Sequence, residues 1–146
     1  MSRYLLDVNV LLALVWPRHE SYEAAHAWFG KTGRHAWATN PLTQLGVLRL
    51  LTNPAVTKGV VGAAAALAAV AEFTRHEGHE FWPLDREIAA CLTVTSGRLR
   101  GHGQWTDAML LWHATERDGV LVSFDSGLKA LAGRDSGSHV LILKNR

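Results

Sequence analysis

The stretch Tyr4-Leu-Leu-Asp-Val-Asn-Val-Leu-Leu-Ala13 decides the fold class of the chain. Its first three residues predict a short buried strand that ends at Asp7. The residues from Val8 to Val15 are apolar apart from Asn9, and Pro17 ends any helix that forms there. The stretch therefore predicts a strand-to-helix unit with an acidic residue at the junction.

A second strand ends in the same way, because the run from Val120 to Phe124 is almost continuously apolar and Asp125 follows it. Such a run is typical of a strand buried on both faces of a parallel sheet. Further strands are predicted at 35–39, 79–83 and 140–143, and helices at 20–29, 41–51, 60–73, 85–94, 106–117 and 126–131. This alternation predicts an α/β fold, with a central, mainly parallel β-sheet flanked by α-helices in a single domain over residues 1–146.

Composition narrows the class of protein. The chain has 146 residues, 48% of them hydrophobic and 19% charged, which suits one globular domain. Its single cysteine, Cys91, excludes an internal disulfide framework and a multi-cysteine metal site. Asp7 interrupts the apolar start that a signal peptide would need, and the longest uncharged apolar run is too short for a membrane span. We therefore expect a cytoplasmic protein without a membrane partner.

Three aspartates occupy the positions where an α/β fold places its chemistry. Asp7 and Asp125 end strands, and Asp107 opens a helix. Because ligands of open α/β sheets bind beyond the carboxyl ends of the strands, we expect these carboxylates to converge on one cleft. Three carboxylates at close range repel one another unless a hard cation neutralises them, which indicates Mg²⁺ or Mn²⁺. The competing interpretation is that each aspartate only caps the helical segment that follows it.

The segments around these acids resemble the ordered motifs of a PIN domain, and more narrowly those of the VapC-type toxins of bacterial type II toxin–antitoxin pairs. The segments are 4–13, Pro41-Leu-Thr-Gln-Leu-Gly-Val-Leu-Arg-Leu-Leu-Thr-Asn-Pro54, Trp105-Thr-Asp-Ala108 and Ser123-Phe-Asp-Ser-Gly-Leu128. The resemblance implies a metal-dependent endoribonuclease, in which water activated by Mg²⁺ or Mn²⁺ hydrolyses RNA phosphodiester bonds. It also implies a homodimer that a cognate antitoxin protein holds inactive.

The resemblance further implies which residues form the site. The family's acidic quartet falls on Asp7, position 44, Asp107 and Asp125, so that the three aspartates are expected to bind the metal. The supporting polar positions are Asn9, Thr106 and Ser123.

Position 44 departs from the family, because it is Gln44 where the family usually has glutamate. An amide keeps an acceptor oxygen but loses a negative charge. Three aspartates can still hold one Mg²⁺, since this ion often uses only one or two protein carboxylates and several waters. Two hypotheses follow: a ribonuclease that tolerates the amide, or a weakened or inactive PIN-fold protein that binds antitoxin or RNA without turnover.

Nucleic-acid contacts are predicted less sharply. The net charge of +2 is compatible with RNA binding but does not identify it. Arg98, Arg100 and Trp105 are candidate RNA contacts, the arginines through phosphates and the indole by stacking on a base. A solvated surface role is the alternative for the arginines. His76 and His79 match no common zinc motif, and we interpret them as loop or solvated histidines.

Overall fold

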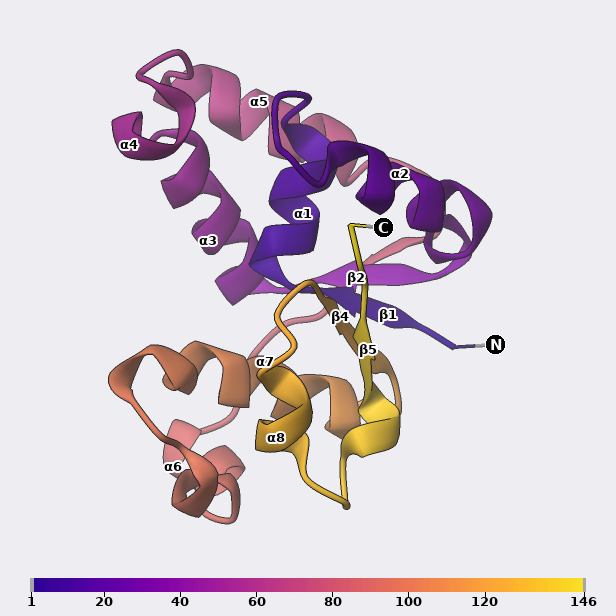
Figure 1. Cartoon of the computed structure of the whole chain (residues 1–146), viewed down its shortest axis with the longest axis vertical. Helices are drawn as coiled ribbons and strands as arrows, with labels where there is room; N and C mark the ends of the chain where they lie inside the picture. Colours follow the sequence, from indigo (N-terminus) through magenta and orange to yellow (C-terminus); the bar gives the residue numbers. More distant parts are fainter. Residues whose placement is uncertain (1, 146) are drawn as a thin grey trace.

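Five short parallel strands form the centre of the computed structural model, which describes residues 2–145 (Figure 1). Their order across the sheet is β3-β2-β1-β4-β5, and every neighbouring pair is parallel. The strands are β1 (Tyr4–Leu6), β2 (Trp37–Thr39), β3 (His79–Phe81), β4 (Val120–Ser123) and β5 (Val140–Ile142). The predicted α/β fold with a central parallel sheet is confirmed.

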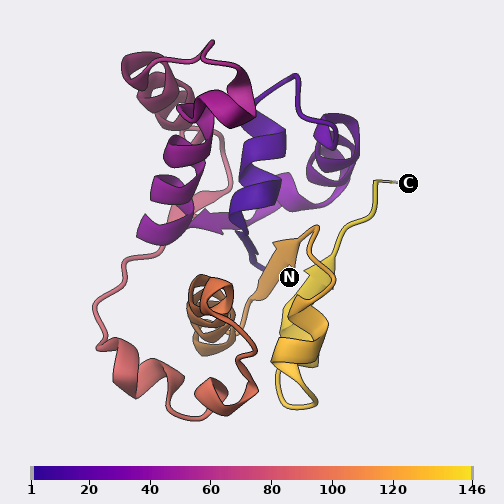
Figure 2. The ribbon, with the colours of Figure 1, turned by 60° about the vertical axis from the view of Figure 1, so that its left-hand side comes forward.

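Helices cover both faces of this sheet (Figures 1 and 2). One side carries α1 (Val8–Val15), α2 (Tyr22–Lys31), α3 (Pro41–Leu51), α4 (Pro54–Thr57) and α5 (Ala63–Phe73). The other side carries α6 (Ile88–Leu92), α7 (Trp105–Glu116) and α8 (Leu128–Ala132). Short 3₁₀ turns lie at Gly33–His35, Thr95–Arg98, His102–Gln104 and Gly137–His139. None of the helices within residues 2–145 combines the length and the apolarity needed to cross a membrane.

Two separate hydrophobic cores explain why the central strands are apolar at successive positions. Leu5 and Leu121 point into the core shared with α7, whereas Leu6 and Val122 point into the core shared with α1. All four side chains are fully buried. Because successive residues of a strand face opposite sides, a sheet covered on both faces needs continuous apolar runs rather than alternation.

The strand order places a crevice at one end of the sheet. From β1 the chain continues outward to β2 and β3 on one side, while β4 and β5 lie on the other side. Connections that leave a central strand in opposite directions open a space beyond its carboxyl end, next to that of β4. Asp7 and Asp125 follow these two strands, so the fold brings them to the same edge.

Several element boundaries differ from the prediction by one to three residues; the helix expected at 85–94, for example, is shortened to Ile88–Leu92, and the strand expected from residue 35 begins at Trp37. The helix expected from residue 60 begins at Ala63, because Gly62 is still extended, with φ −87° and ψ 168°. The region predicted as a loop from residue 96 to 104 contains two 3₁₀ turns. The helix at Pro41–Leu51 has the bounds that were expected, since Asn40 forms a reciprocal capping box with Thr43 and proline occupies the first helical turn.

Candidate metal-dependent nuclease site

Asp7 is a buried carboxylate at the junction of β1 and α1, with 6% of its surface exposed. Its Oδ1 accepts a hydrogen bond of 2.7 Å from the backbone N–H of Val8, and this bond caps α1. Its Oδ2 accepts a hydrogen bond of 2.7 Å from the hydroxyl of Ser123, the last residue of β4. Both bonds hold the carboxylate in one orientation at the carboxyl edge of the sheet.

Ser123 is the centre of a small polar network. Besides donating to Asp7, its Oγ accepts hydrogen bonds from Asn9 Nδ2, at 3.1 Å, and from the backbone N–H of Asp125, at 2.9 Å. Asn9 Oδ1 in turn accepts the backbone N–H of Phe124, at 3.2 Å. The structure thus brings together Asp7, Asn9 and Ser123 as the sequence predicted, and ties the loop that carries Asp125 to them.

Asp107 and Asp125 complete an acidic region. Asp107 is partly buried in the first turn of α7, and its pKa is raised to about 6, chiefly by burial and then by the negative charges of Asp7 and Asp125. Burial also raises the pKa of Asp7, against the hydrogen bonds from Ser123 and Val8, and the charge of Asp125 adds to that rise. The three carboxylates therefore lie within electrostatic reach of one another.

The acidic region is open rather than a closed cage. Over residues 2–145, no three His, Cys, Asp or Glu side chains lie close enough together to hold a metal ion by themselves. Asp125 is exposed, and its Oδ1 accepts the backbone N–H of Gly127, at 2.9 Å. The arrangement suits an ion that keeps several waters, as Mg²⁺ does, better than one that needs a complete protein shell.

Helix capping accounts for only part of these acids. Asp7 does cap α1, and Asp125 forms a local turn before α8. Asp107 caps nothing, because α7 already starts at Trp105 and the aspartate lies inside its first turn. A carboxylate inside a helix that is buried beside two others needs another explanation.

Gln44 lies on α3, one turn after the helix start, and is partly buried. Its Nε2 donates a hydrogen bond of 3.0 Å to Thr39 Oγ1, at the end of β2. Thr39 Oγ1 is also 2.8 Å from His79 Nε2. Sequence reasoning missed Thr39. The available signal was the polar residue Thr39 at the end of an otherwise apolar strand. The strand predicted from residue 79 is confirmed as β3, but the interpretation of His79 as a loop or solvated histidine is wrong, because its side chain is partly buried and contacts Thr39.

Comparison with known proteins identifies the family. The PIN domain model matches residues 4–134. The chain belongs to the PIN domain family.

Similar proteins place the chain among the VapC-type PIN domains. It is 38% identical over 124 residues to Ribonuclease VapC39 of Mycobacterium tuberculosis, which covers 85% of this chain and 89% of that protein. It is 38% identical over 131 residues to Ribonuclease VapC44 of the same organism, covering 89% and 91%. The fold also matches the crystal structure of VapBC2 from Rickettsia felis bound to a DNA fragment from their promoter, with a TM-score of 0.64 and 12% identity over 97% of this chain and 98% of that one.

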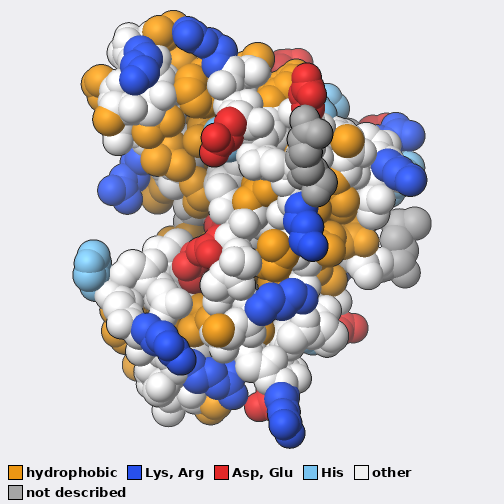
Figure 3. Space-filling view, viewed as in Figure 1, with side chains coloured by type: hydrophobic (Ala, Val, Ile, Leu, Met, Phe, Trp, Pro, Cys, Tyr) orange, Lys and Arg blue, Asp and Glu red, His pale blue; other side chains and the backbone are white. Residues whose placement is uncertain are grey.

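A cleft of about 710 Å³ adjoins the acidic region of this PIN domain. It runs between the start of α1, α3 and the residues before and at the start of α7, and its walls include Val8, Leu45, Arg49 and Thr106. Val8 and Thr106 are the neighbours of Asp7 and Asp107 in the chain, although none of the three aspartates lines the cleft itself. Figure 3 shows acidic side chains at the indentation between the two helical layers, with Lys and Arg side chains on the surface around it.

The three candidate RNA contacts differ in their freedom. Arg98 donates from Nη1 to the backbone oxygen of Ala132, at 3.2 Å, and its Nη2 is 3.5 Å from Asp135, so it is engaged in holding α8. Arg100 is exposed, and Trp105 is 51% exposed at the start of α7. Arg100 and Trp105 are therefore the two accessible members of the predicted set.

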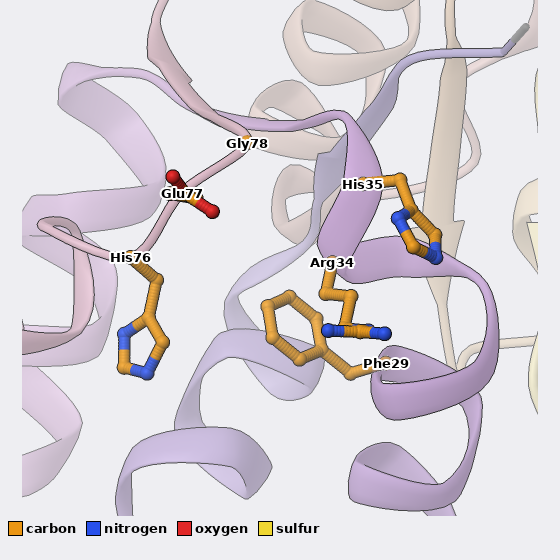
Figure 4. Close-up of a pocket in the computed structure, with 6 residues that line it drawn as sticks. All are labelled: Phe29, Arg34, His35, His76, Glu77 and Gly78. Atoms are coloured by element: carbon orange, nitrogen blue, oxygen red, sulfur yellow. The ribbon is translucent and has the colours of Figure 1, made fainter.

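A second hollow, of about 670 Å³, lies at the amino ends of β2 and β3, away from the acids (Figure 4). It is lined by Phe29, Arg34, His35, His76, Glu77 and Gly78. None of the predicted site residues borders it, so the PIN domain's acidic edge remains the candidate for chemistry.

Proposed function

We propose that this PIN domain is the metal-dependent endoribonuclease toxin of a type II toxin–antitoxin pair. The observation that carries the proposal is the placement of Asp7 and Asp125 just after the adjacent strands β1 and β4, with Asp107 in the first turn of α7 and within reach of their charges. The relatives named ribonucleases support the choice of RNA as the substrate.

The donor set fits a hard divalent cation. Carboxylate oxygens are the ligands that Mg²⁺ and Mn²⁺ prefer. Burial and then the charges of Asp7 and Asp125 raise the pKa of Asp107, and a cation between the carboxylates would relieve the repulsion. Asp7, Asp107 and Asp125 would hold the ion, with Gln44 at a fourth, neutral position. When bound, the cation supplies acidification of water and stabilisation of charge on the scissile phosphate.

The remaining residues act on the carboxylates and on RNA. Ser123 orients Asp7 by donating its hydroxyl hydrogen, and Asn9 fixes the hydroxyl of Ser123 in turn. Thr106 lines the cleft beside Asp107, where it contacts the substrate or supports the carboxylate.

Arg100 and Trp105 would bind the RNA backbone and a splayed base respectively. Arg98 would add positive potential while it holds α8. These contacts position the strand across the acidic edge.

The partner would be a cognate antitoxin protein, and the active form a homodimer in the cytoplasm. The name of the VapBC complex supports the antitoxin, because it describes a solved structure of the same fold. The apolar side chains in the cleft next to the carboxylates supply a surface on which such a partner could block the site.

The test is a cleavage assay with the purified, antitoxin-free chain and total RNA in Mn²⁺, Mg²⁺ or EDTA. The parent protein is expected to cut RNA in either metal and to stop in EDTA. Asp107→Asn removes the activity, whereas the matched Asp118→Asn, an exposed aspartate with a positive φ of 52° that asparagine tolerates, keeps it.

Gln44→Glu separates the two hypotheses about position 44. If the parent does not cleave RNA and Gln44→Glu does, the chain is a PIN-fold nuclease weakened by the amide at position 44. If neither protein cuts the RNA while both bind it, the function is binding without turnover, and the ribonuclease proposal is refuted.

A further inference from the structure

A chain of side-chain hydrogen bonds leads away from Gln44. Gln44 Nε2 donates to Thr39 Oγ1 over 3.0 Å, and Thr39 Oγ1 is 2.8 Å from His79 Nε2. The threonine is fully buried, and the ring of His79 lies against that of Trp37 with centroids 4.6 Å apart. The three groups come from α3, β2 and β3, so the chain is made by the fold and not by local sequence.

The donors and acceptors fix the direction of each hydrogen bond in the series Gln44–Thr39–His79. An amide nitrogen only donates, so Thr39 Oγ1 accepts from Gln44. Among the partners of this hydroxyl within residues 2–145, only His79 Nε2 can accept its hydrogen. A buried hydroxyl hydrogen without an acceptor is costly, so Thr39 donates to Nε2 and the imidazole carries its own hydrogen on Nδ1.

The surroundings of His79 agree with a neutral ring. Burial lowers the pKa of His79, while a backbone hydrogen bond with Thr74 and the charge of Glu80 act in the opposite direction. A neutral imidazole offers one acceptor nitrogen, which here faces Thr39, and one donor nitrogen, for which the Thr74 backbone is the partner.

We propose that Thr39 and His79 are positioning residues for Gln44, holding its amide nitrogen on Thr39 so that Oε1 is the oxygen presented at the fourth position of the carboxylate site. Within residues 2–145, Gln44 Oε1 accepts no hydrogen bond, which leaves it free for this task. The inference rests on the proposed function, because it assigns the fourth position of the same site. It means that the amide fits its surroundings in the fold, because it donates to the buried Thr39, which in turn contacts the partly buried His79.

A carboxylate at position 44 would reverse the direction of both hydrogen bonds. Carboxylate oxygens only accept, so Thr39 would turn its hydroxyl hydrogen toward residue 44. The threonine oxygen would then have only lone pairs for His79, and Nε2 would have to carry a hydrogen. The tautomer of His79 is therefore a reporter of which atom of residue 44 faces Thr39.

The first experiment is ¹⁵N NMR of the imidazole of His79 in the metal-free, full-length protein at pH 8, with the signal assigned by its absence in His79→Phe. The parent is expected to show Nδ1 protonated and Nε2 bare, and Gln44→Glu to show Nε2 protonated. In Thr39→Val, which lacks the hydroxyl, changing residue 44 no longer alters the ring. A parent with Nε2 protonated would overturn the proposal, because Oε1 would then be the atom on Thr39.

The second experiment measures Mn²⁺ affinity by electron paramagnetic resonance, together with kcat on RNA. Thr39→Val is expected to weaken Mn²⁺ binding and kcat about 10- to 100-fold, as loss of an outer partner of a metal site does. Thr39→Ser keeps the hydroxyl and rescues both quantities. The matched control is Thr57→Val, which removes another buried hydroxyl, one that donates to Leu51 over 2.9 Å, and leaves both quantities unchanged.

Equal Mn²⁺ affinities for Thr39→Val and Thr57→Val would refute the positioning role. If neither the parent nor Gln44→Glu cleaves RNA, the proposed ribonuclease is refuted instead, and the positioning role is still tested because the NMR and Mn²⁺ measurements need no RNA.

Discussion

Replacing Asp107 with asparagine should make the metal-free protein more stable while it destroys the proposed activity. Burial and two neighbouring carboxylates raise the pKa of Asp107 from 3.8 to about 6. The folded protein therefore holds this proton more tightly than the unfolded chain, and folding becomes less favourable as the pH rises from about 4 to about 6. An uncharged amide at position 107 avoids that loss.

The size of the effect follows from the shift. A difference of about 2 pKa units corresponds to about 3 kcal/mol at 1.36 kcal/mol per unit. Asp107 is only partly buried, so solvent screening reduces the figure to about 1–2 kcal/mol at pH 7.5. For a domain of this size, such a gain raises Tm by about 3–6 °C.

Thermal unfolding in EDTA at pH 7.5 and at pH 4.5 measures this difference directly. The Tm of Asp107→Asn should exceed that of the parent at pH 7.5. The two Tm values should converge at pH 4.5, where the carboxyl of Asp107 is protonated in the folded parent. Asp118→Asn, at an exposed site, should follow the parent at both values. Added Mg²⁺ should stabilise the parent more than Asp107→Asn, since the ion binds only the folded carboxylate site. A variant that is no more stable than the parent at pH 7.5 would refute the raised pKa of Asp107.

Three further perturbations test the hydrogen-bond network around Ser123, the buried His113 of α7 and the packing of α1 on α3. Ser123→Ala removes the donor to Asp7 and should lower the RNA cleavage rate about 10- to 100-fold; an unchanged rate at saturating Mn²⁺ would contradict the orienting role. Burial, aided by Arg117, lowers the pKa of His113 to about 4, so urea unfolding should show stability falling as the pH drops from about 6.5, and His113→Gln should flatten that slope. Gly46→Ala would place a Cβ 2.5 Å from a valine methyl of α1 and should cost about 1–3 kcal/mol, whereas Gly30→Ala, with open space around it, should raise Tm slightly; similar Tm values for the two would contradict the close packing of α1 on α3.

Much of the fold was visible in the sequence because hydrophobic periodicity and capping act locally. The apolar run at 120–124 and the Asn40–Pro41 pair predicted a strand and a helix start with little dependence on the rest of the chain. The convergence of Asp7 and Asp125 also followed, since the carboxyl ends of parallel strands lie at one edge. The order of the strands was not predictable, because it depends on which runs pair across long sequence separations.

The parts of the site that escaped prediction depend on such long-range pairs. The strand that carries His79 was predicted, but its partner was not, because the pairing of β2 with β3 places the ring next to Thr39, 40 residues away in the chain. Arg98 reads as a free cation until Ala132 and Asp135 come within reach of its guanidinium. When several polar partners are available to a side chain, the tertiary structure decides which of them it contacts. The neighbouring residues in the sequence do not encode that choice.

The hydrogen bond between Asp7 and Ser123 has a consequence for the time at which the proposed site forms during synthesis. The two residues are 116 positions apart, and β1 has to wait for β4 before its central place in the sheet is filled. At bacterial and eukaryotic synthesis speeds of about 5–20 residues per second, that interval lasts roughly 6–23 s. Throughout it, the growing polypeptide displays Asp7 without the strand that orients it. Prematurely terminated products that lack β4 are therefore expected to lack the proposed nuclease activity. A protein inhibitor synthesised at the same time could bind the growing chain during this interval, before the proposed site is complete.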